Sequence, residues 1–279
     1  MSMREPRSER PGALGTLGFH VDGTPCRVAC SYCYLGARPR AGERALSPGV
    51  AAEVAAALPA RDLAVSVSEP APKWRPHVEA LAKVAADREL SLAVTTTVDV
   101  ATDHPWVAEL ADRLSLSIDP EKGARSVDMK AIARVAAFAE AEGAEVVAIA
   151  SLVTPEFSAA LQDGLLAELL AIDALSTVAL NGLKPPPPWC DANHWRRFCA
   201  NVAPLLDHHL GRRLVLDCYV AARIFRLGEC PGKTDVAAGR EFRSCVYQRE
   251  PDFVFEGAAE LADRLRGWRV PARCPFPIR

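Results

Sequence analysis

Residues 114–153 read LSLSIDPEKGARSVDMKAIARVAAFAEAEGAEVVAIASLV and contain a complete strand–helix–strand unit. Apolar residues in 114–118 and again in 145–153 predict two strands. Between them, residues 127–142 carry apolar side chains at helical spacing and are followed by Gly143, a typical helix end. Such a unit predicts two parallel strands joined by a right-handed helical crossover.

The same alternation extends in both directions from this unit. We predict further strands at 14–21, 63–68, 90–98 and 177–183, and further helices at 48–58, 75–87, 104–113 and 155–172. Ser47 before Pro48 and Thr154 before Pro155 have the residue types that cap and begin helices. Six strands with five intervening helices by residue 184 predict an α/β fold, a partial (β/α)6 TIM-like barrel.

The chain divides into three predicted parts. Residues 1–13 are rich in Arg, Glu, Ser and Pro and predict a loose leader, and residues 14–188 form the barrel. After residue 188 the alternation weakens, with helices predicted at 191–209 and 257–266 and a strand at 213–220. We interpret residues 189–279 as a cysteine-containing C-terminal extension that caps one end of the barrel.

Composition narrows the class of protein. The 279 residues are 49% apolar, which supports a buried core. A formal net charge of -2 provides no basic field for wholesale binding to nucleic acid or to an anionic membrane. The N-terminus has no apolar signal segment, and no apolar run reaches membrane-spanning length. We therefore expect a cytoplasmic protein with neither a membrane nor a nucleic-acid partner.

Three of the nine cysteines lie close together after the first predicted strand, at Cys26, Cys30 and Cys33. In a reducing compartment such spacing indicates metal ligation more than disulfides. Three thiolates from one loop would hold a [4Fe–4S] cluster and leave one iron open for a substrate or cofactor. Structural zinc and a redox dithiol are the alternatives, although zinc prefers paired C-x2-C knuckles and a dithiol gives Cys26 no role.

This C-x3-C-x2-C motif, with Tyr32 directly before its last cysteine, resembles that of the radical SAM superfamily. The resemblance covers residues 14–187. It implies a [4Fe–4S] cluster on the three cysteines and S-adenosylmethionine chelated to the fourth iron, with Tyr32 beside the cofactor. It also implies that an electron, delivered by a donor such as flavodoxin or ferredoxin, releases a 5′-deoxyadenosyl radical that abstracts hydrogen from a substrate.

The resemblance further implies cofactor contacts at the carboxyl ends of the strands. Val67-Ser68-Glu69 stands where the family often has Gly-Gly-Glu, which contacts the cofactor amino group; the acid is kept and the glycines are not. Ser117 and Asp119 resemble family positions that bind the ribose or carboxylate. Asn181, at the end of the sixth strand, is a further candidate. Helix capping by Glu69 and a turn role for Asp119 are the alternatives.

Other strand-end and loop residues are weaker candidates. Thr95, Thr96 and Thr97 are also good strand formers. Leu152 and Val153 fit a core equally well. Arginine is common on surfaces. The glycine would let backbone approach adenine. These residues are Thr95, Thr96, Thr97, Leu152, Val153, Gly182, Arg27 and Arg38.

Four cysteines of the extension, Cys218, Cys230, Cys245 and Cys274, could supply a second set of thiolates. Cys230 and Cys274 are each followed by proline, as are some cysteine ligands of iron–sulfur clusters. An auxiliary iron–sulfur cluster, a hydrogen-atom donor and small buried thiols all stay open. We interpret the remaining cysteines, Cys190 and Cys199, as structural, and the histidines His104 and His194 as ordinary helix residues.

The extension favours a peptide, protein or small natural product as the substrate. A non-catalytic iron–sulfur protein that carries electrons or senses redox state is the alternative function.

Overall fold

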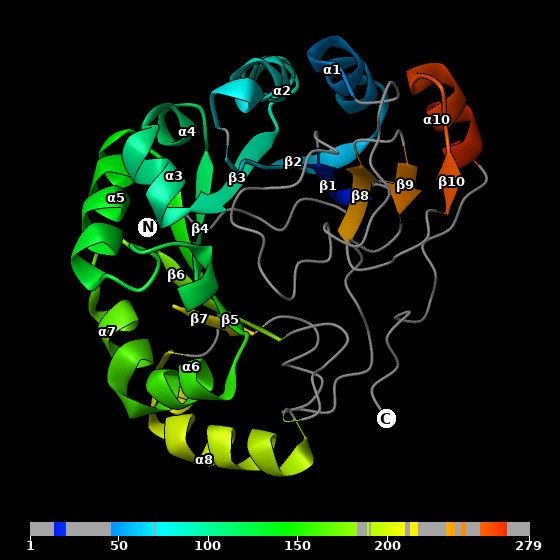
Figure 1. Ribbon diagram of the computed structural model, residues 1–279. Helices are drawn as coiled ribbons and strands as arrows, with labels where there is room; N and C mark the ends of the chain where they lie inside the picture. Colours follow the sequence, from blue (N-terminus) through cyan, green and yellow to red (C-terminus); the bar gives the residue numbers. More distant parts are fainter. Residues whose placement is uncertain are drawn as a thin grey trace.

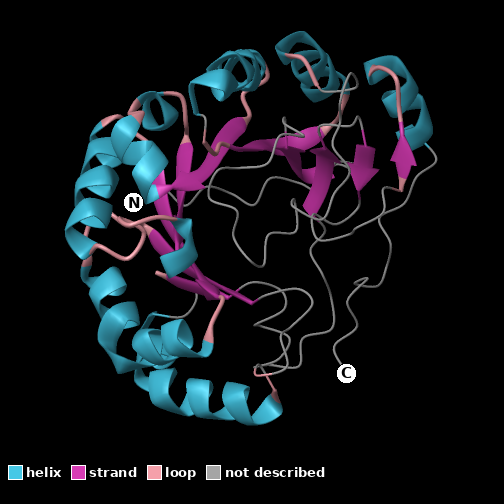
Figure 2. Cartoon of the chain, in the orientation of Figure 1, coloured by secondary structure: helices cyan, strands magenta, loops and turns pink. Residues whose placement is uncertain are grey.

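The computed structural model describes residues 14–20, 46–69, 71–182, 189, 191–209, 213–216, 233–237, 241–243 and 252–266. Figure 2 shows these parts by secondary structure. Several predicted features lie outside them: the leader 1–13 and residues Cys26, Arg27, Cys30, Tyr32, Cys33, Arg38, Cys190, Cys218, Cys230, Cys245 and Cys274.

The described strands form one ten-stranded sheet in the order β10-β9-β8-β1-β2-β3-β4-β5-β6-β7 (Figure 1). Neighbours from β8 through β1 to β7 are parallel, whereas β9 and β10 are antiparallel additions. The strands are β1 (Leu14–His20), β2 (Ala60–Ser66), β3 (Ser91–Thr97), β4 (Arg113–Ile118), β5 (Glu145–Leu152), β6 (Thr177–Gly182), β7 (Leu214–Leu216), β8 (Lys233–Ala237), β9 (Glu241–Arg243) and β10 (Phe253–Val254).

Helices connect these strands, and α1, α2, α5, α7 and α8 lie along the outer side of the curved sheet (Figure 1). The helical segments are α1 (Pro48–Ala57), η2 (Ala71–Trp74), α2 (Arg75–Asp87), α3 (Val98–Asp103), α4 (Trp106–Glu109), η3 (Pro120–Lys122), α5 (Met129–Ala141), α6 (Pro155–Ala160), η4 (Leu161–Leu165), α7 (Leu166–Ala171), α8 (Ala192–His209) and α10 (Ala258–Arg266). This arrangement confirms the α/β class and the partial barrel, because the strand order runs open-ended from β10 to β7.

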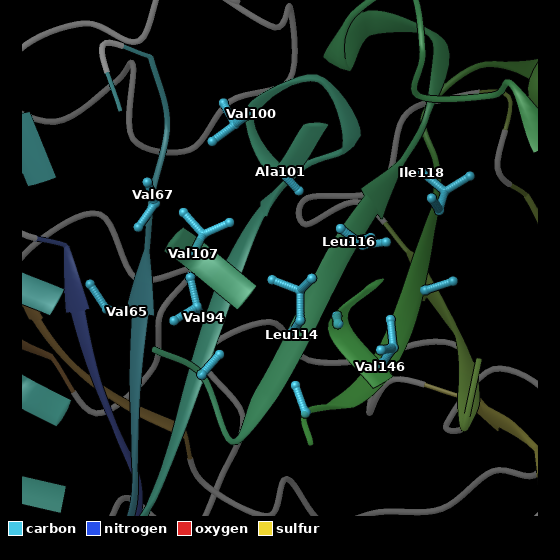
Figure 3. Close-up of a cluster of buried hydrophobic side chains, with 14 of the residues drawn as sticks. Val65, Val67, Val94, Val100, Ala101, Val107, Leu114, Leu116, Ile118 and Val146 are labelled. Atoms are coloured by element: carbon cyan, nitrogen blue, oxygen red, sulfur yellow. The ribbon is translucent and has the colours of Figure 1, made fainter. Parts of the chain in front are cut away.

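The outer face of the sheet is mainly apolar and packs against the helices. Because side chains alternate along a strand, every second residue belongs to this face. Its members are at most 1% exposed, and burying each Leu or Val contributes about 1.5–3 kcal/mol. Figure 3 shows part of this layer, where side chains of β2–β5 meet residues of α3 and α4. The set is Leu17, Phe19, Leu63, Val65, Leu92, Val94, Leu114, Leu116, Ile118, Val146, Ala148, Ala150, Leu152, Val178 and Leu180.

The inner face, formed by the alternate residues of β1–β6, is made of small and hydroxyl-bearing side chains. Charged residues occur on it only at the amino ends of the described strands, at Asp62, Arg113 and Glu145. Toward the carboxyl ends it carries Gly18, His20, Ala64, Ser66, Ala93, Thr95, Thr97, Ser115, Ser117, Val147, Ile149, Ser151, Ala179 and Asn181.

Most predicted helix ends are confirmed at their caps. The Ser47 hydroxyl accepts a hydrogen bond from the Val50 N–H at 3.3 Å, and Thr154 accepts one from the Phe157 N–H at 3.1 Å. Helix α2 spans the predicted residues 75–87, and Gly143 follows α5 with φ of 91°. Local capping chemistry therefore fixed the starts of α1 and α6 and the end of α5, whereas α2 begins without a side-chain cap.

Four predicted elements have wrong boundaries. The strand predicted at 63–68 is β2, which begins earlier and ends earlier, at Ala60–Ser66. The strand at 90–98 ends at Thr97, because the Thr97 hydroxyl accepts from the Val100 N–H at 3.2 Å and starts α3. The helix at 104–113 shrinks to α4, and the helix at 155–172 is interrupted by the π-helical turn η4. The Thr97 cap ends β3, and Gly164, with φ of 134°, interrupts the helix at η4.

The described strands of the extension join both edges of the sheet. Its strand β7 adds to β6 at one edge of the sheet, while β8 pairs in parallel with β1 at the other. Backbone N–H and C=O groups of an edge strand need partners, and a later segment of the chain supplies them.

Candidate functional site

The carboxyl ends of β2–β6 bring the strand-end candidates to one edge of the sheet. Thr97 lies in register with Ser117, and Ser151 with Asn181. Glu69 follows β2 and Asp119 follows β4. Because parallel strands end at the same edge, Ser68, Glu69, Ser117, Asp119 and Asn181 share one rim of the barrel.

Glu69 is held by two neighbours. Its Oε2 accepts a hydrogen bond from the Ala71 N–H at 3.2 Å, which caps η2. Its Oε1 lies 3.5 Å from Nε2 of His104, the residue that follows α3. Next to it, the Ser68 carbonyl accepts a hydrogen bond from the Trp74 indole at 2.9 Å. The capping role is therefore real, and a carboxylate has lone pairs for a further donor.

Asp119 is fully buried at the end of β4. Its Oδ1 accepts a hydrogen bond from the Glu121 N–H at 2.9 Å, so Asp119 caps the turn η3. This is the turn role that was the alternative prediction for Asp119. Its neighbour Ser117 is half-buried on the inner face. The two candidates of β4 thus differ: one organises the rim loop, and the other presents a hydroxyl.

The rim loop after β4 is anchored to α3. The Arg125 N–H donates to Asp99 at 3.2 Å, and the Arg125 guanidinium reaches Asp103 at 2.6 Å. That hydrogen bond, with the charge of Asp103, raises the pKa of Arg125. Gly123, at φ of 131°, packs so closely on Asp99 that a side chain would clash with its carboxylate. These contacts fix the segment that carries Asp119.

The weaker candidates divide by face. Thr96 is 2% exposed on the outer side and donates its hydroxyl hydrogen to the Val67 carbonyl at 2.9 Å. Thr97 caps α3, and Leu152 and Val153 belong to the hydrophobic core. Only Thr95 of this group presents a half-buried hydroxyl to the inner face.

A row of hydroxyls below the rim was missed as a unit. Ser66 lies in register with Thr95, and Thr95 with Ser115, across β2, β3 and β4. The alternation of Leu114, Ser115, Leu116 and Ser117 is a sequence signal for a polar inner face, but the pairing of strands is not visible in it. His104, predicted as an ordinary helix residue, lies beside Glu69.

Metal ligands cannot be assigned from the described side chains, since no group of three or more His, Cys, Asp or Glu lies together among them. Within the same residues, no helix combines the length and apolar character needed to cross a bilayer.

No protein-family model matches the chain, and neither does any curated protein. Among solved structures it is similar to a truncated 3-deoxy-D-arabino-heptulosonate 7-phosphate synthase from Thermotoga maritima, with 15% identity, 74% of this chain and 75% of that chain covered, and a TM-score of 0.36. It is also similar to the tryptophan synthase A-subunit from Pyrococcus furiosus, with 14% identity and a TM-score of 0.35. That match covers 74% of this chain and 87% of that chain. A third similar structure is thiamine phosphate pyrophosphorylase from Pyrococcus furiosus, with 12% identity and a TM-score of 0.26. That match covers 92% of this chain and 98% of that chain.

Proposed function

We propose that this chain is a radical SAM enzyme that holds a [4Fe–4S] cluster on Cys26, Cys30 and Cys33. The observation that carries the proposal is where this motif stands in the chain. Residues 21–45 connect the carboxyl end of β1 to α1, and the other strands bring their candidate residues to that same edge. An active site assembled from several strand ends is the usual arrangement in βα barrels.

The described rim residues fit the chemistry of S-adenosylmethionine. Glu69 keeps lone pairs for an ammonium group, and the Ser117 hydroxyl and Asn181 carboxamide suit a ribose or a carboxylate. The hydroxyls and amide offer donors and acceptors without adding charge. Tyr32, next to the third cysteine, is proposed as a further contact.

When bound, the cluster and S-adenosylmethionine would supply one-electron cleavage of the C5′–S bond, which yields methionine and a 5′-deoxyadenosyl radical. The part of the chain is to bind, orient and exclude water. Glu69 is oriented by the Ala71 N–H and by His104, and Asp119 shapes the loop above Ser117. A flavodoxin or ferredoxin is the proposed electron donor, and a small molecule or peptide is the proposed substrate.

Cys218, Cys230, Cys245 and Cys274 are proposed as auxiliary ligands or as a source of a hydrogen-atom donor. Iron analysis separates these roles, because one [4Fe–4S] cluster gives about four irons per chain and two clusters give about eight.

The test is anaerobic purification followed by iron, sulfide and S-adenosylmethionine cleavage assays on the reduced protein. We expect a brown protein that forms 5′-deoxyadenosine and methionine, and loss of both products in the Cys26→Ala, Cys30→Ala, Cys33→Ala triple variant. Cys199→Ala, in α8, is the matched control and keeps both products. A cluster without cleavage would favour the electron-transfer alternative, and a colourless zinc protein would reject the proposal.

A further inference from the structure

The hydroxyl row, Ser66, Thr95 and Ser115, lies one step below the rim residues on the inner face. Adjacent strands are about 4.8 Å apart, so the row spans roughly 10 Å across β2, β3 and β4. Its neighbours toward the amino ends are Ala64 and Ala93, which are in register with each other. Ser66 and Thr95 therefore stand beside methyl side chains, whereas the corresponding neighbour of Ser115 is Arg113.

The row keeps its hydrogen-bonding capacity. None of the three hydroxyls forms a hydrogen bond with another residue of the described chain, although Ser115 is only 7% exposed. The hydroxyl of the next residue, Thr96, differs from these three, because it donates a hydrogen bond to the Val67 carbonyl. Each serine or threonine hydroxyl can donate one hydrogen bond and accept two, so the row offers both functions at three points.

The charged side chains nearest the row on the inner face form an ion pair, Arg113–Glu145. On the inner faces of the described strands β1–β6, the nearest cation is Arg113, which lies below Ser115 and pairs with Glu145 at 2.7 Å. Val147 continues the register beyond Ser115 and adds an apolar flank. An anionic phosphate or carboxylate would find no unpaired cation on this surface of the strands, whereas neutral hydroxyls would find reciprocal partners.

We infer that the hydroxyl row binds an uncharged, polyhydroxylated part of the substrate. The inference rests on the proposed function, because it assigns a substrate class to the same barrel. The rim then holds the cofactor, and the row holds the group that faces it from below. Reciprocal donor and acceptor pairing favours vicinal hydroxyls over an amide, whose donor and acceptor have fixed directions.

The test measures binding by saturation-transfer NMR on the full chain, both before and after anaerobic cluster reconstitution. The probes are methyl α-glucoside, glucose 6-phosphate and N-acetylalanine methylamide. We expect the glucoside to bind best, and Ser66→Ala, Thr95→Val and Ser115→Ala each to weaken it about 3- to 10-fold. Thr102→Val is the matched control, because its hydroxyl bonds within α3 to the Val98 carbonyl at 2.7 Å.

Tighter binding of glucose 6-phosphate would overturn the inference, since a cation would then govern recognition. Preference for the amide probe would overturn the inference in favour of a peptide substrate. The inference would also be overturned if no probe bound, or if Thr102→Val weakened binding as much as the variants of the row. Circular dichroism confirms that each variant is folded. Cleavage of S-adenosylmethionine, measured in the same samples without a probe, fails or succeeds independently and bears on the proposed function alone.

Discussion

The outer and inner faces of the sheet are built from alternate residues of the same strands, and they serve different ends. On β4, Leu114, Leu116 and Ile118 are fully buried under helices, while Ser115 and Ser117 point the other way. The outer face gains stability from apolar burial. The inner face gives up that gain and retains hydroxyls for a ligand, so stability and recognition are separated by one residue along the strand.

The largest difference between the faces is expected from truncating their side chains. Leu116→Ala opens a hole in a fully buried layer and should destabilise the fold by about 2–5 kcal/mol. Ser117→Ala, its neighbour on the inner face, should change stability by less than about 0.5 kcal/mol. Urea denaturation of both variants measures this. Equal losses would mean that the inner face is packed as tightly as the outer one.

A second test concerns the rim loop, where the two faces meet. Gly123→Ala places a side chain against Asp99 at φ of 131° and should cost roughly 2–3 kcal/mol. Gly143→Ala is the control, because φ is 91° there but no atom lies within 4 Å of the added carbon. Its cost should stay near 1 kcal/mol, from backbone strain alone. Thermal unfolding ranks the pair, and the reverse order would show that contact with α3 does not hold the loop.

A third test uses two adjacent threonines on opposite faces. Thr96→Val leaves the Val67 carbonyl without its hydroxyl donor and should destabilise the fold by about 1 kcal/mol. Thr95→Val removes a hydroxyl that makes no hydrogen bond within the described chain, so its effect on stability should fall below about 0.5 kcal/mol. Denaturant midpoints for the two variants decide the matter. A larger loss in Thr95→Val would reveal a structural role for the inner row.

The smallest effect is a pH dependence within the helix layer. His194 of α8 is 8% exposed, and its Nε2 lies 3.3 Å from the Ser158 hydroxyl of α6. Burial, with the charge of Arg197, lowers the pKa of His194 below 6.5, and Asp191 offsets part of this. The native state therefore favours the neutral ring.

The sign of the dependence follows from which state binds the proton. The unfolded chain protonates first, so this contribution is present above pH 6.5 and is lost as the pH falls from 6.5 toward the native pKa. Denaturant midpoints at pH 7.5 and 5.5 should show the loss in wild type and in the exposed-site control His208→Ala. In His194→Phe this component should vanish. An unchanged pH profile in that variant would remove His194 as its source.

Much of the barrel was predictable because its signals are local. The caps at Ser47 and Thr154 and the periodicity of residues 75–87 each depend on contacts within a few residues. Strands β8 to β10 were not predicted, since Lys233–Ala237 lacks a clear apolar alternation and is a strand through its pairing with β9 and with the distant β1. That pairing depends on distant sequence, which local pattern does not encode.

The candidate site divides in the same way. Glu69, Ser117 and Asp119 are candidates from the sequence because strand ends are visible in it. The hydroxyl row was not assembled beforehand, because Ser66, Thr95 and Ser115 come together only through the register of three strands. The capping roles that were the alternatives for Glu69 and Asp119 both occur, alongside their place on the rim.

The pairing of β1 with β8 sets a timing problem for synthesis of the chain. More than 200 residues separate His20 from Lys233, so at about 5–20 residues per second one edge of β1 waits roughly 10–40 s for its partner. During that interval the unpaired edge can join a strand of another nascent chain. Slower translation lengthens the exposure, and we expect the yield of soluble protein to depend on chaperones that hold the emerging barrel until residues 233–237 arrive.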